Sequence, residues 1–372
     1  MSTKYSPLLT VIIILFAFSI SSGEINTAIN IGGGYNGNLF NDSLVTEDSY
    51  STFGGHINYY PSSSIQLLAF GQYSAYKTNN DLSNINGGGS IKIIPTSELS
   101  SISIIFSGEL SHKGFGNFYS LYNQNNFATS ARIIYQVASK FHIKSKVSYS
   151  AVSYINSDYG SRNGLTLSGG FNLIPFGTNS LNFNTAYYFG GYDQMPLDLD
   201  NSMGRQSNRT EEYDSYSLAD ITIRYSRPIG SRTGISVTLG RRYIQHDESF
   251  IVADFDVDYL SPLANLWSGP SGFVFIKHHF PKQFTLELKG GFKEKSFINA
   301  IEYSADEIET YQQSTRNDSF ASFLISLSKP INIGSGNLLT PKVSVYYSSN
   351  RSTDDLYDYS NFSTSLSMNV RF

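Results

Sequence analysis

The twelve residues from Asn361 to Phe372 read N-F-S-T-S-L-S-M-N-V-R-F. Successive side chains of an extended strand point to opposite faces, so every second residue belongs to one face. One face of this segment is apolar and ends on an aromatic residue, and it comprises Phe362, Thr364, Leu366, Met368, Val370 and Phe372. The other face is polar and comprises Ser363, Ser365, Ser367, Asn369 and Arg371. The segment therefore predicts an amphipathic β-strand without a break in register.

The composition favours a membrane protein built from strands. Of the 372 residues, 40% are hydrophobic, 15% aromatic and only 15% charged, whereas a soluble domain carries roughly 25% charged residues. The mean hydropathy is nevertheless slightly negative, at -0.20, which argues against a bundle of membrane helices. A membrane barrel satisfies both observations because half of each strand faces lipid and half faces water. The net charge of -4 gives no indication of nucleic-acid binding. Cysteine is absent, which excludes disulfides and a lipid-modified N-terminal cysteine.

The N-terminus has the pattern of a secretory signal peptide over residues 1–23. Lys4 provides a positive charge, and an apolar stretch from Leu8 to Ile20 follows it. That stretch is shorter than the roughly 20 residues of a membrane-spanning helix. We expect cleavage after Gly23, which leaves residues 24–372 as one barrel domain. The alternative is an uncleaved anchor.

From residue 25 onward, segments of alternating polarity are separated by two kinds of turn. Short turns mostly contain a proline directly after the strand, as at Pro95 and Pro175, and long polar loops alternate with them. Short turns on one side and long loops on the other are typical of outer-membrane barrels, with the short turns in the periplasm and the long loops outside the cell. We predict an all-β, up-and-down antiparallel transmembrane barrel of about sixteen strands, within two either way. The expected strands are 25–36, 49–60, 65–76, 83–94, 101–112, 127–138, 141–154, 163–174, 180–192, 214–227, 233–246, 267–280, 284–297, 319–329, 340–350 and 361–372. A soluble β-sandwich or a repeat protein is the alternative, but the strands of a sandwich are typically shorter, at about 5 to 6 residues.

The charged residues of these strands fall opposite the apolar positions. A charge on the lipid face costs about 2–4 kcal/mol at the bilayer midplane, so we expect these side chains to point inward. The basic pore-lining candidates are Lys92, Arg132, Lys144, Lys146, Arg224, Arg242, Lys289, Lys293 and Arg371. The long loops are acidic instead, so the sequence predicts a basic lumen beneath acidic loops. Aromatic residues near strand ends, such as Tyr59, Tyr154, Tyr187 and Phe280, suit the interfacial girdles of a barrel.

Taken together, the signal peptide, the strand pattern and the terminal strand resemble the Gram-negative outer-membrane β-barrel proteins, in a broad porin-like sense. The resemblance covers the whole mature chain. It implies location in the outer membrane, in contact with its lipid, and delivery by periplasmic chaperones to the barrel-assembly machinery. It also implies that Leu366, Met368, Val370 and Phe372 form the assembly signal.

The sequence leaves the function between three classes. A basic lumen favours a porin-like passive channel for small solutes, since a confined ring of like charge selects the opposite sign. The alternative is a non-conducting structural or surface-interaction barrel that acts through its long acidic loops. A surface enzyme near His246 would need partner motifs that the sequence does not contain, so we expect no enzyme and no cofactor. Asp254, Asp256 and Asp258 could hold calcium, but solvated acidic loops are the favoured interpretation, and no metal site is predicted.

Overall fold

The computed structural model describes residues 23–95, 101–116, 118–155, 161–175, 177–192, 214–246, 267–302, 312–334 and 336–372. The predicted signal peptide, except for Gly23, lies outside these residues. No helix in this part of the chain is long and apolar enough to cross a membrane.

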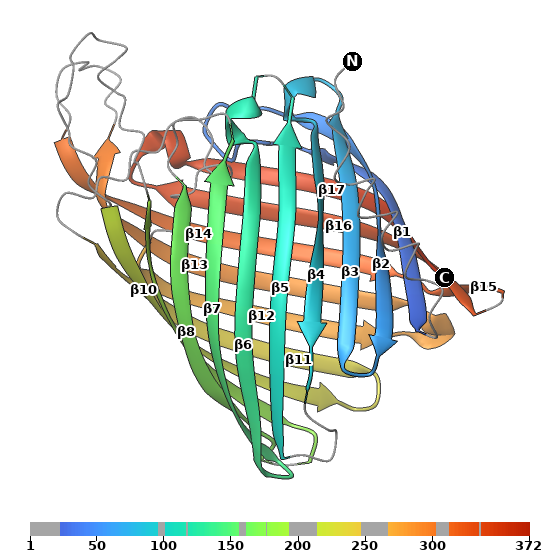
Figure 1. Ribbon diagram of the computed structural model, residues 1–372. Helices are drawn as coiled ribbons and strands as arrows, with labels where there is room; N and C mark the ends of the chain where they lie inside the picture. Colours follow the sequence, from blue (N-terminus) through green and yellow to red (C-terminus); the bar gives the residue numbers. More distant parts are fainter. Residues whose placement is uncertain are drawn as a thin grey trace.

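The chain forms one antiparallel sheet whose strands follow each other in sequence order (Figure 1). The first half comprises β1 (Glu24–Asn36), β2 (Asp48–Ser62), β3 (Ile65–Tyr76), β4 (Asn84–Ile93), β5 (Ile102–Phe115), β6 (Gln124–Ala138), β7 (Phe141–Tyr154), β8 (Arg162–Leu173) and β9 (Ser180–Tyr192). The second half comprises β10 (Asp214–Ile229), β11 (Thr233–His246), β12 (Gly269–His279), β13 (Thr285–Glu302), β14 (Gln312–Ser328), β15 (Ile331–Gly334), β16 (Asn337–Ser352) and β17 (Tyr359–Arg371). Short 3₁₀ turns occur at η1 (Asn80–Leu82), η2 (Ser120–Tyr122), η4 (Pro281–Gln283) and η5 (Asp355–Tyr357).

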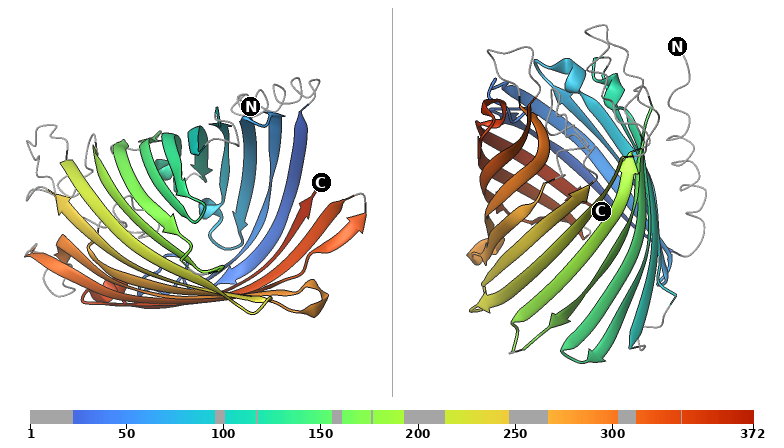
Figure 2. Two further views of the ribbon diagram at one scale, coloured as in Figure 1. Left: turned by 90° about the horizontal axis from the view of Figure 1, so that it is seen from below. Right: turned by 90° about the vertical axis from the view of Figure 1, so that its left-hand side faces the viewer.

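The terminal strand closes the sheet into a barrel. β17 pairs with β1 over nine residue pairs, from Ala28↔Arg371 to Asn36↔Ser363, while β1 also pairs with β2. Sixteen long strands form the closed wall, because β14 pairs directly with β16 and the four-residue β15 pairs only with the start of β16. The predicted fold class and number of wall strands are confirmed. Seen from below, the wall of β2–β9 lies opposite the wall of β10–β17 (Figure 2).

Three local predictions were wrong. Residues 298–318 were expected to form a loop, but β13 extends to Glu302 and β14 begins at Gln312. The hairpin continues because the two strands resume their backbone pairing, from Ala300↔Ser314 to Glu302↔Gln312, beyond a register shift that follows Phe297. Two prolines expected just after strands, Pro61 and Pro228, lie instead in the last residues of β2 and β10, where loss of one N–H donor costs little. β15 was not predicted.

The outer surface is an apolar band. Its exposed side chains include Ile143, Val147, Ile221, Ile223 and Phe292, which suit contact with lipid and not with water. Tyr187 and Phe280 are also exposed on this surface, whereas Tyr59, which was expected in the same girdle, is buried. Tyr154 is paired with Gln124 on the same face as Arg132 and Lys146, so its expected place in an outer aromatic girdle was wrong. A groove of about 420 Å³ on this band is lined by outward residues such as Ile91, Phe106 and Ala131.

Buried polar side chains fasten the loops at the end of the barrel opposite the short turns. The carboxylate of Asp48 accepts hydrogen bonds from the backbone N–H groups of Thr78 (3.0 Å) and Asn79 (2.8 Å). Near the β1–β17 junction, the Asn361 amide donates to the carbonyl of the fully buried Asn38 at 2.8 Å. These bonds satisfy backbone groups that leave the sheet ladder, and they fix the rim of the barrel.

Candidate channel lining

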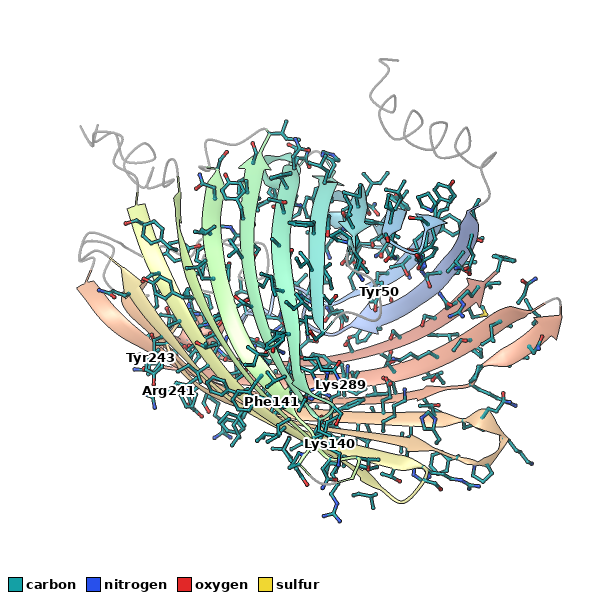
Figure 3. The ribbon with its side chains drawn as sticks, turned by 60° about the horizontal axis from the view of Figure 1, so that its bottom comes forward. Tyr50, Lys140, Phe141, Arg241, Tyr243 and Lys289 are labelled. Atoms are coloured by element: carbon teal, nitrogen blue, oxygen red, sulfur yellow. The ribbon has the colours of Figure 1, made fainter. Side chains whose placement is uncertain are left out.

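The strand registers place all nine basic candidates on the inward face. Residues paired across neighbouring strands share a face, and the pairs can be followed around the barrel. Arg132 pairs with Lys146, Arg224 with Asn182, and Arg371 with Ala28. Lys289 faces the interior, whereas Arg241 and Tyr243 project from the outside of the wall (Figure 3). The nine inward candidates are Lys92, Arg132, Lys144, Lys146, Arg224, Arg242, Lys289, Lys293 and Arg371.

On the wall of β2–β9, called the first wall below, positive charge is concentrated on β6 and β7. Arg132 lies directly opposite Lys146, and Lys144 lies two residues along the same strand as Lys146. Among the described residues, none of the three forms an ion pair with a carboxylate. Their neighbours on β8 are small, because Lys144 faces Gly170 and Lys146 faces Ser168.

On the opposite wall, carboxylates are interleaved with the cations. Arg242 binds Asp220 through two hydrogen bonds, from Nε to Oδ1 at 2.8 Å and from Nη2 to Oδ2 at 2.9 Å. Glu287 lies between two lysines, with Lys342 Nζ at 3.3 Å and Lys277 Nζ at 3.7 Å. These pairs partly neutralise the second wall.

A buried cluster stands at the loop-side end of β13 and β14. Arg316 donates to Asp318 from Nε and Nη2, at 3.2 Å each, and both side chains are at most 3% exposed. The guanidinium also lies 4.0 Å from the ring centre of Phe297 and 3.6 Å from that of Tyr357. Sequence reasoning missed this cluster because it assigned residues 298–318 to a loop. The alternation Arg316, Asp318, Phe320, Ser322 was the signal that could have revealed it.

A second group of aromatic residues surrounds the neighbouring cations. The buried Trp267 lies 4.8 Å from the Arg242 guanidinium and 5.9 Å from Lys293 Nζ. Phe320 lies 5.8 Å from Lys293 Nζ. Ring faces attract cations, so these contacts hold Arg242 and Lys293 at defined places on the inner wall.

Several other expectations cannot be placed. The acidic run Asp254 to Asp258 and the acidic stretch 303–309 lie outside the described residues, as does the side chain of His246. Within the described ranges, no group of three or more His, Cys, Asp or Glu side chains is arranged to hold a metal ion.

The terminal strand presents its apolar face outward. Leu366, Met368 and Phe372 are 53%, 43% and 51% exposed, and the backbone N–H of Phe372 donates to the carbonyl of Thr27 at 3.0 Å. The last residue is therefore paired to β1 while its ring remains accessible. The role of Leu366, Met368, Val370 and Phe372 as an assembly signal remains a prediction.

Comparison with known proteins gives structural matches only. No family model matches the chain, and no curated protein matches it. Acinetobacter baumannii OccAB1 is similar over 94% of this chain and 97% of its own, with 9% identity and a TM-score of 0.50. Pseudomonas aeruginosa OccK8 (OprE) is similar over 94% and 98%, with 10% identity and a TM-score of 0.48. Pseudomonas aeruginosa OprD is similar over 94% and 95%, with 10% identity and a TM-score of 0.47. The match to OccAB1 agrees with the closed antiparallel barrel described above: the chain has the fold of an outer-membrane porin.

Proposed function

We propose that the mature chain is an outer-membrane protein that forms a porin-like passive channel for small solutes and favours anions. The observation that carries the proposal is the set of inward basic residues, and above all Arg132, Lys144 and Lys146, which lack carboxylate partners among the described residues. Barrels of sixteen strands are wide enough for an aqueous channel. Within such a confined lumen, fixed positive charge raises the local concentration of anions.

Conductance in a planar bilayer tests this proposal. The refolded mature chain should show steady single-channel currents, and its reversal potential in a KCl gradient should indicate chloride preference. Reversing one charge, as in Arg132→Glu, Lys144→Glu or Arg224→Glu, should lower the ratio of chloride to potassium permeability severalfold. The double variant Asp220→Asn with Arg242→Gln removes a balanced ion pair and should leave that ratio nearly unchanged. A folded barrel without conductance would contradict the channel.

The second candidate is a non-conducting barrel that acts through its loops. It is favoured by inward-facing residues that are almost completely covered. Ser326 and Ser348, on the inner face of β14 and β16, are each only 2% exposed, so side chains pack over this part of the inner wall. The same bilayer measurement separates the two candidates.

A further inference from the structure

Two positive charges face each other directly on the first wall. Arg132 and Lys146 are register partners on β6 and β7, a position in which side chains begin about 4.5–5.5 Å apart. Lys144 follows on the same face of β7, about 7 Å along the strand. Like charges directly opposite one another destabilise a sheet. An anion among the three side chains would relieve this repulsion.

The protein itself does not supply that anion within the described residues. Across the strands β4 to β9, Glu109 is the only acidic residue, and it pairs with Ala128, four residues away from Arg132 on β6. Four residues of strand span about 13 Å, which is beyond an ion pair. The other wall contrasts with this one, because Asp220, Glu287 and Asp318 each pair with a cation there.

The side chains that flank the three cations are apolar on one side, where Ile105 pairs with Arg132 and Ile134 with Lys144, and small and polar on the other. Ser130 faces Ser148 one step from the Arg132–Lys146 pair, and Ser168 and Gly170 flank the lysines on β8. Lys144 and Lys146 are partly exposed, and Arg132 is exposed. The Ser130 and Ser107 hydroxyls lie 2.8 Å apart, so hydroxyl donors stand beside the charged groups.

We propose that Arg132, Lys144 and Lys146 form a binding site for a phosphate group, either free phosphate or the end of a phosphorylated small solute. A guanidinium binds phosphate through two parallel hydrogen bonds, and lysines add point charges. A phosphate monoester carries about −1.5 to −2 charges at pH 7 and three acceptor oxygens. A monocarboxylate offsets only one of the three positive charges, so phosphate matches the site better. The inference rests on the proposed function, because it needs a lumen that small solutes can enter.

Block of the chloride current tests the site. Inorganic phosphate and a hexose phosphate are each added to the conducting wild-type channel, and the half-blocking concentration is measured. Lys146→Gln and Arg132→Gln should each raise that concentration at least tenfold. Lys289→Gln is the matched control: it removes an inward charge from the other wall, 5.5 Å from the Phe275 ring. This control should lower anion preference but change the half-blocking concentration less than twofold.

A direct measurement of phosphate binding tests the site separately from the channel. Titration calorimetry of phosphate onto the refolded barrel in detergent measures binding whether or not the barrel conducts. Binding that Lys146→Gln weakens supports the site even in a barrel that does not conduct. A conducting wild type that neither binds nor is blocked by either phosphate overturns the site and leaves the channel standing. Equal block by acetate, or an equal effect of Lys289→Gln, also overturns it. The stronger of the two blockers tells whether free phosphate or a phosphorylated solute is the better ligand.

Discussion

Arg316 is held by both charge and ring faces, and it links β14 to the loop before β17. Its guanidinium binds Asp318, which also receives the Ser352 hydroxyl at 2.7 Å and lies 3.9 Å from Lys295 Nζ. Removing one partner of a buried ion pair costs about 3–5 kcal/mol when the remaining charge is left uncompensated. Because Lys295 and Ser352 still contact Asp318, we expect Arg316→Ala to lower the free energy of unfolding by less, about 2–3 kcal/mol, measured by urea titration of the refolded barrel.

Arg241→Ala is the control variant for Arg316→Ala. Arg241 lies on the outer surface, 5.1 Å from the Tyr243 ring, and surface substitutions usually change stability by about 0.5 kcal/mol or less. Equal losses in the two variants would mean that the contacts of Arg316 contribute no special stability.

At the scale of whole strands, the pairing of β1 with β17 requires a glycine. A Cβ added at Gly34 would lie 2.2 Å from the carbonyl oxygen of Thr364 and 2.9 Å from the Tyr50 hydroxyl. The first neighbour is backbone of the closing strand and cannot move without disturbing the ladder. Gly34→Val should therefore destabilise barrel closure by about 1–3 kcal/mol. The measurement is gel electrophoresis of samples heated to increasing temperatures. The compact folded form of the variant should disappear at a lower temperature than that of the wild type.

Gly71→Val provides a matched comparison on β3, which is separated from β1 by β2. No atom lies within 4 Å of a Cβ added at Gly71, so this variant should melt close to the wild type. If both valine variants unfold at the same lowered temperature, the loss of a strand glycine in general would explain the effect, and the contact with Thr364 would not.

For the strands, the sequence predicts that a strand exists more accurately than it predicts where the strand begins and ends. The alternation from Phe362 to Phe372 is sufficient for the closing strand, because one polar face toward the lumen and one apolar face toward lipid fix its register. Charge placement follows from the same period, which is why Arg132, Lys146 and Arg224 could be assigned to the inner face. The Arg316 cluster could not be foreseen, since its partners Phe297 and Tyr357 come from separate segments that only tertiary pairing brings together. The difference between the two walls, where the described residues include unpaired cations on one and ion pairs on the other, could not be foreseen for the same reason. It depends on which strands are neighbours in the sheet.

For the molecule as a whole, the proposed anion preference comes from a fixed field and not from a tight fit. Screening shortens the range of such a field from about 10 Å at 0.1 M salt to about 3 Å at 1 M. We therefore expect the ratio of chloride to potassium permeability to be largest in dilute KCl and to approach the ratio of the free mobilities near 1 M. Reversal potentials at a constant gradient but different mean concentrations measure this. The variant Asp220→Asn with Arg242→Gln should follow the wild-type curve, whereas Lys144→Glu should flatten it. A preference that stays constant across this salt range would instead mean that ions are sorted at a narrow constriction, with the charged walls of secondary importance.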